Sequence, residues 1–102
     1  MNIEDIRNSI KKDDYEIQLH ALERMGERDI SLTDVQTMID TGEIIETYAD
    51  DQPFPSCLIV SIVEDRPLHA VVAYDKSQKK SHIITVYEPD KGEFEDDFQT
   101  RR

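Results

Sequence analysis

The chain has 102 residues, of which 37% are hydrophobic, so it has room for one domain with a thin core. Its 12 basic and 23 acidic residues give a net charge of −11, which argues against loose, salt-driven binding to nucleic acid. The single cysteine, Cys57, excludes an intramolecular disulfide and a cysteine-rich metal site. Because Cys57 opens an apolar run, we expect it to be a buried, inert thiol.

The charge is unevenly distributed along the chain. Residues 31–56 carry six acidic side chains and no Lys or Arg. This segment predicts an acidic patch that does not contact nucleic acid and that suits a basic protein partner. No segment approaches the roughly 20 apolar residues of a membrane span, and the acidic, amphipathic N-terminus is unlike a signal peptide. We therefore predict a cytoplasmic protein without membrane contact, whose oligomeric state the sequence leaves open.

The front of the chain has helical patterns. Residues 2–12 repeat isoleucine at helical spacing, and Asn2 is suited to cap the N-terminus of that helix. Residues 15–19 alternate apolar and polar side chains, which is typical of a short strand or of an extended entry to the next helix. Residues 20–29 then predict a second helix.

A third helix is predicted over residues 32–41. Ser31 and Asp34 form a capping-box pattern at its start, with Asp in the usual Glu position. Its apolar positions recur at helical spacing, which predicts one buried stripe. Gly42 is expected to end the helix as a C′ glycine.

From Glu43 the apolar period changes to two, which predicts four strands over residues 44–49, 57–64, 68–75 and 81–88. Short links, among them Asp65-Arg66-Pro67, favour an antiparallel meander. The two central strands are apolar at almost every position, so both faces of the sheet centre should be covered. We therefore predict one α+β domain over residues 1–102, with N-terminal helices packed on a four-stranded antiparallel sheet. Residues 89–102 form an acidic tail that should either fray or dock a last turn through Phe94 and Phe98.

The densest group of candidate functional residues is His20, Arg24 and Arg28. Their i, i+4, i+8 spacing places all three on one face of a helix. Two arginines at i, i+4 repel each other, and a charged histidine at a helix N-terminus interacts unfavourably with the helix dipole. These three residues therefore do not stabilise the helix, which suggests another role for them. A bound phosphate would remove this repulsion, and His20 is suited to act as a general acid or base. The alternative is a solvated helix face on which Glu27 pairs with Arg24.

The other two histidines are weaker candidates. His69 alternates with Val71 and Ala73, and it is expected to be structural unless it faces His20. His82 begins the last predicted strand and is expected to be exposed. The spacings of 49 and 13 residues between the histidines match no short ligand motif, so we predict neither a metal site nor a cofactor.

The last predicted strand offers hydroxyl groups. By alternation, Ser81, Ile83, Thr85 and Tyr87 should share one face. Tyr87 lies near the strand end, where it is suited to donate a hydrogen bond or to stack on a base; the alternative is an aromatic rim that covers the core. The chain has three glycines and no Gly-rich phosphate loop, and it lacks both a nucleophile elbow and an HExxH motif.

These residues also carry a family resemblance. Over roughly residues 18–89 the chain resembles the small bacterial family called domain of unknown function 4258, through the runs His20-Ala-x-x-Arg24-Met-x-x-Arg28-x-Ile30-Ser31, Gly42-Glu43-Ile44-Ile45-Glu46, Leu68-His69-x-Val71 and Ile84-Thr85-Val86-Tyr87. That family is distantly similar to the RelE-like toxins, including the BrnT and MqsR types. These are small domains with helices before an antiparallel sheet; many cut mRNA, and they often pair with a small antitoxin.

The resemblance implies a RelE-like fold and a metal-independent endoribonuclease of a toxin–antitoxin pair, with RNA and a cognate antitoxin as partners. The site residues that it implies are His20, His69 and Tyr87 for catalysis and Arg24, Arg28 and Thr85 for substrate binding. RelE-like toxins are typically basic, whereas this chain is acidic. The alternative is therefore a non-catalytic domain of the same fold that binds a protein partner or a small anion through the same arginines.

Overall fold

A computed structural model describes residues 1–89 of the chain, so the expectations for the tail from residue 90 onward lie outside the described part. The elements in chain order are α1 (Ile3–Lys11), β1 (Tyr15–Ile17), α2 (Leu19–Glu27), α3 (Leu32–Thr41), β2 (Glu43–Tyr48), β3 (Ser56–Val63), β4 (Arg66–Asp75) and β5 (Lys80–Tyr87). The three predicted helices and four predicted strands are confirmed to within about two residues at each end. No helix in residues 1–89 is both long and apolar enough to cross a membrane.

The sheet is mixed and has five strands in the order β1-β5-β4-β3-β2. Strands β2 to β5 form the predicted antiparallel meander, but β1 pairs in parallel with β5, with Tyr15 opposite Ser81. The prediction of a four-stranded, wholly antiparallel sheet was therefore wrong. Alternation over three residues suggests a strand, but it contains no information about the neighbour or the direction of pairing. Here β1 covers the outer edge of β5, which would otherwise leave backbone groups unpaired.

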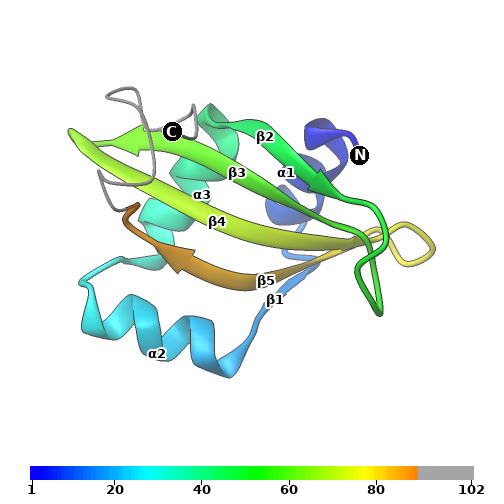
Figure 1. Ribbon diagram of the computed structural model, residues 1–102, viewed down its shortest axis with the longest axis horizontal. Coiled ribbons are helices and arrows are strands. Elements are labelled where there is room, and N and C mark those ends of the chain that lie inside the picture. Colours follow the sequence, from blue (N-terminus) through cyan, green and yellow to red (C-terminus); the bar gives the residue numbers. More distant parts are fainter. Residues whose placement is uncertain (90–102) are drawn as a thin grey trace.

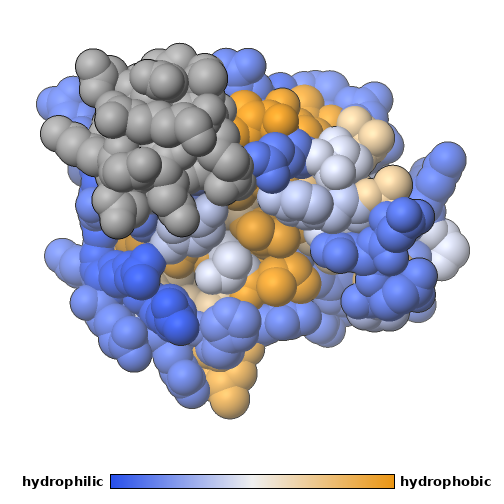
Figure 2. Space-filling model, viewed as in Figure 1, coloured by the Kyte–Doolittle hydropathy of each residue, from blue (hydrophilic) through white to orange (hydrophobic). Residues whose placement is uncertain are grey.

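The helices are arranged around one face and one edge of the sheet (Figure 1). Helix α3 packs on β3, α1 packs on α3 and β5, and α2 lies along β5. The central strands bury side chains on both faces, as expected: Ile59 and Val72 belong to the core under the helices, and Leu58 and Val60 are buried on the opposite face. Figure 2 shows this opposite face, where hydrophobic surface lies over the middle of the sheet and hydrophilic side chains lie over α2.

The starts of two helices are capped as the sequence predicts. The Asn2 side chain accepts a hydrogen bond from the Glu4 amide at 2.9 Å at the start of α1. Ser31 and Asp34 form a reciprocal capping box at the start of α3, with both hydrogen bonds at 3.0 Å. Because each cap joins residues within one turn, local sequence is sufficient to specify it.

Gly42 ends α3 for a different reason from the one predicted. A C′ glycine usually adopts a left-handed conformation, but Gly42 has φ −85° and ψ −177°, which any residue can adopt. What excludes a side chain is space: a Cβ on Gly42 would lie 2.4 Å from the Met38 carbonyl oxygen and 2.5 Å from that of Val60. The glycine therefore permits the close approach of β3 to the end of α3.

Candidate functional site

Helix α2 presents the predicted row of basic residues to solvent. Ala21 and Met25 are its buried positions, and His20 and Arg24 are exposed. Arg28 lies at the C-cap, where it is half-buried and where its amide still donates to the Arg24 carbonyl at 3.0 Å. The row therefore extends along the whole helix, and it ends at the last helical hydrogen bond.

The side chains of the row have no internal partners in the described part of the chain. Within residues 1–89, His20, Arg24 and Arg28 form no side-chain hydrogen bond or ion pair, and the alternative pairing of Glu27 with Arg24 is not observed. The chain's other two described arginines are engaged. Arg7 binds Glu4 and two backbone carbonyls, and Arg66 binds Glu88 and two backbone carbonyls. The charges of the row are therefore available to an external anion.

Arg66 anchors the C-terminal end of α2 to the sheet. Its guanidinium donates to the carbonyls of Arg28 and Asp29 and forms an ion pair with Glu88. Since Arg66 begins β4 and Glu88 directly follows Tyr87, this one side chain brings the C-terminal end of α2 next to the end of β5. Sequence reasoning did not single out Arg66, because its partners lie 22 to 38 residues away and form no local pattern.

His69 does not face His20 but faces Tyr87. The two residues are opposite each other on β4 and β5, with ring centroids 5.4 Å apart and ring planes tilted by 60°. His69 is 0% exposed, and Tyr87 is half-buried. Tyr87 is therefore the more accessible ring of the pair, and the imidazole of His69 has no contact with solvent.

A bulge divides the residues that were predicted to share one face of β5. Val71 pairs with Thr85, but the next residue, Val72, pairs with Ile83, so β5 contains one extra residue. As a result Ile83 joins the core under the helices, together with the buried Ser81. Thr85, which is half-buried, lies with Tyr87 on the opposite face, so the prediction of a single face was wrong.

His82 is not exposed as expected but half-buried. Its ring stacks on that of Phe54, with centroids 5.1 Å apart and an interplanar angle of 12°. Strand β1 places Glu16 opposite it, with the carboxylate 3.7 Å from Nδ1. A hydrogen bond from Lys80 at 2.7 Å is the main reason that the pKa of Glu16 lies below its ordinary value. The parallel strand β1, which the sequence did not reveal, thus creates this charged cluster.

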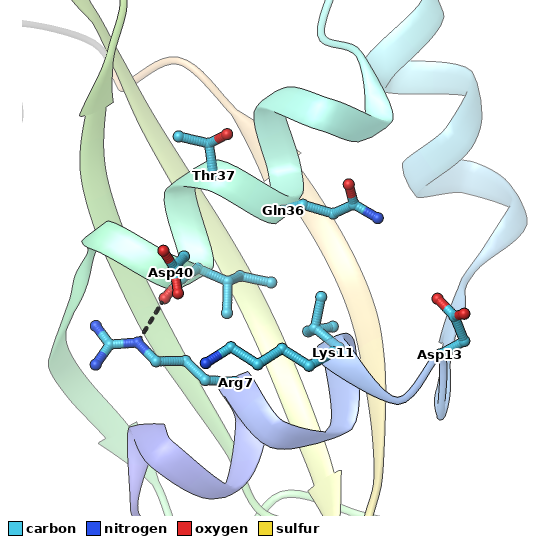
Figure 3. A pocket seen from close by; sticks show the side chains of 8 residues that line it. Arg7, Lys11, Asp13, Gln36, Thr37 and Asp40 are labelled. Carbon is cyan, nitrogen blue, oxygen red and sulfur yellow. Dashed lines mark hydrogen bonds between the residues drawn. The ribbon is translucent and has the colours of Figure 1, made fainter.

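No residue of the row on α2 lines the groove between α1 and α3. This groove has a volume of about 440 Å³ and is lined by Arg7, Lys11, Asp13 and Asp40 among others (Figure 3). There the Arg7 guanidinium donates to the carbonyls of Ile39 at 3.0 Å and Gly42 at 2.7 Å, so it caps the end of α3. In residues 1–89 no three His, Cys, Asp or Glu side chains are placed to hold a metal ion.

These features describe a small α+β domain in which an exposed helix face carries a row of basic side chains beside a mixed sheet. Residues 17–88 match the family described as "Domain of unknown function (DUF4258)", and the chain belongs to that family. The match begins just before α2 and ends just after Tyr87, so it includes all six predicted site residues. No curated protein and no solved structure matches the chain.

Proposed function

We propose that the protein is a metal-independent endoribonuclease of the RelE-like toxin type. The observation that supports this most directly is the basic row on α2, because His20, Arg24 and Arg28 have no partner within residues 1–89. Arginine binds phosphate oxygens with a planar, bidentate fork, and RNA supplies phosphates at regular spacing. The row is thus chemically suited to an RNA backbone in the cytoplasm.

In this proposal the arginines position one phosphodiester and His20 moves the proton. His20 takes the proton of a ribose 2′-hydroxyl, whose oxygen then bonds to phosphorus while the bond from phosphorus to the 5′-oxygen breaks. The leaving 5′-oxygen takes a proton from solvent water, and the resulting hydroxide is neutralised by the proton that His20 accepted; the products are a 2′,3′-cyclic phosphate and a 5′-hydroxyl. Arg24 and Arg28 stabilise the charge that develops on the phosphorane.

The sheet residues have supporting roles in the proposal. Tyr87 lies at the strand end that Arg66 holds beside α2, and Thr85 is on the same face of β5. Tyr87 stacks on or orients a base, and the hydroxyl of Thr85 binds the substrate. His69 contacts the Tyr87 ring from a position without solvent access, which fits a positioning role better than proton transfer to RNA.

The burial of His69 also supports the alternative of a non-catalytic module. RNA cleavage needs proton removal at one oxygen and proton delivery at another, and His20 is the only exposed histidine in this chain. A domain with one exposed histidine and two arginines that have no partner within residues 1–89 is sufficient to bind an anion without cutting it. In that case the same row binds a phosphate or an acidic protein segment.

The test is an incubation of the purified protein with single-stranded RNA in excess EDTA. The endoribonuclease proposal expects fragments that end in a 2′,3′-cyclic phosphate, and no cleavage of the same sequence with 2′-O-methyl riboses, which lack the attacking hydroxyl. Binding of RNA or phosphate without cleavage would favour the non-catalytic module. Absence of any binding at low ionic strength would contradict both, because salt weakens phosphate contacts.

A further inference from the structure

A second groove lies at the opposite end of the sheet from α2. It has a volume of about 470 Å³ and lies between α3 and the end of β3. Its lining on α3 consists of Thr33, Asp34, Thr37 and Thr41, and on the strands of Glu43, Val60, Ser61, Ile62, Val63 and Glu64. Since α2 packs along β5, this groove is separate from the basic row.

The floor of the groove is a strand edge without a partner. Strand β2 begins at Glu43, which pairs with Val60, but β3 continues to Val63. Residues 61–63 pair with β4 on one side, and no strand in residues 1–89 pairs with them on the other. An unpaired edge of this kind is a template for the addition of a strand.

The backbone of Ile62 points its polar groups into this groove. A Cβ on Gly42 would lie 2.5 Å from the Val60 carbonyl oxygen, so the polar groups of Val60 face the β2 side. Backbone groups alternate along a strand, so the N–H and C=O of Ile62 face the same side. Ile62 therefore forms a non-hydrogen-bonded pair with Pro67, the residue opposite it on β4. The Ile62 side chain is itself 59% exposed, so it offers apolar contact beside the free backbone groups.

The acidic side chains around the groove determine which kind of ligand it can bind. Residues 29–65 contain nine acidic side chains and no Lys or Arg. Glu43 and Glu64 lie at the ends of the free edge and form no ion pair with another described residue. RNA is repelled by this charge, and so is a second copy of a chain whose net charge is −11. A cationic segment is attracted.

We propose that the groove is the docking site for a short, extended, basic segment of a partner protein. The segment adds to β3 as an edge strand, makes backbone hydrogen bonds to Ile62, packs an apolar side chain beside Ile62 and places Lys or Arg side chains against Glu43 and Glu64. This inference does not depend on the proposed RNA chemistry, because no residue of the α2 row lines the groove.

The probe is a short synthetic peptide of alternating lysine and valine, added to the isotope-labelled full chain at low ionic strength. We expect amide NMR shifts concentrated at residues 60–64 and along α3, and slower hydrogen exchange of the Ile62 amide. A matched peptide of alternating glutamate and valine should cause neither change. Equal binding of both peptides, or shifts centred on another surface, would overturn the proposal.

Two variants test the backbone and the charge separately. Ile62→Pro removes the free N–H, and the double variant Glu43→Lys, Glu64→Lys reverses the charge; each should weaken peptide binding roughly tenfold or more. A double variant with the same change of charge on α2, Glu23→Lys with Glu27→Lys, should retain binding. RNA binding should survive Ile62→Pro. Undiminished peptide binding by the two groove variants would contradict the proposal that a basic partner segment docks here. The same holds if sedimentation shows that the unchanged protein is a dimer and that Ile62→Pro converts it to a monomer.

Discussion

The rings of His69 and Tyr87 face each other across β4 and β5, with centroids 5.4 Å apart. His69 is 0% exposed, so its imidazole is out of reach of a molecule in solvent. His20, by contrast, lies exposed on the first turn of α2. Substitution of His20 should therefore affect activity but not stability, whereas substitution of His69 should lower stability.

His20→Ala should leave the stability of the domain nearly unchanged, because the side chain is exposed and has no partner in residues 1–89. If the protein cuts RNA, the same change should lower the rate on the order of 10²- to 10⁴-fold, as for loss of a general acid or base. His69→Ala is the matched control, since the loss of a buried ring should lower the free energy of unfolding by about 2–5 kcal/mol. Urea unfolding and RNA cleavage measured on both variants decide the assignment. A His20→Ala protein that unfolds like a core variant would return His20 to a structural role.

Arg24→Ala and Arg28→Ala should each weaken RNA binding without unfolding the domain. Arg24 is exposed, Arg28 is half-buried, and neither forms an ion pair within residues 1–89, so each contributes little to stability, whereas each phosphate contact contributes to affinity and to its dependence on salt. We expect the slope of log affinity against log salt to fall by about one for each arginine removed. Filter binding over a range of salt concentrations measures this slope. Lys76→Ala, in the exposed turn before β5, is the control and should leave the slope unchanged.

Arg66→Lys should loosen the end of α2. Lysine keeps the positive charge for Glu88, but it lacks the fork that reaches the carbonyls of Arg28 and Asp29 together. Amide hydrogen exchange should therefore speed up at the C-terminal turn of α2 and in the following loop, while the amides between β3 and β4 remain protected. Unchanged exchange in α2 would mean that Arg66 does not hold this helix in place.

Gly42→Ala should destabilise the domain by about 1–3 kcal/mol or more, because the new Cβ would meet two backbone carbonyls at 2.4 and 2.5 Å. Gly26→Ala is the matched control. Gly26 lies inside α2 with open space around its Cα, so alanine should raise stability by about 0.5–1 kcal/mol through its higher helix propensity. Thermal unfolding of both variants tests the pair, and two shifts of the same sign would contradict the described packing of β3 against α3.

Cys57 should be unreactive in the folded protein. Burial raises the pKa of its thiol from 9.0 to about 11, so almost no thiolate forms at pH 8. Ellman's reagent should react only after urea unfolds the chain. Since the unfolded thiol ionises first as the pH rises, the contribution of this group to stability is complete below pH 9.0 and is lost as the pH approaches about 11. Rapid labelling of the native protein at pH 8 would show that β3 opens at this position.

The sequence alone determined the features that depend on neighbours along the chain. The capping box of Ser31 and Asp34 joins residues within one turn, and the helical period places His20 and Arg24 outside the buried stripe of Ala21 and Met25. The meander of β2 to β5 is equally local, because short links leave antiparallel pairing as the simplest path. For the same reason the sequence alone contains both the family resemblance and the basic row.

The tertiary structure decided whatever depends on pairing between distant segments. The parallel register of β1 on β5 and the bonds from Arg66 to Arg28 each join residues far apart in the chain. The bulge that turns Ile83 away from Thr85 depends on how β5 pairs with β4. Alternation of apolar and polar residues predicts that a segment is a strand. The pattern does not tell which strand it pairs with, whether the pairing is parallel or antiparallel, or whether the strand contains a bulge. The physical reason is that register and partner are selected by packing of the whole core, so only the folded chain fixes which side chains reach the same face.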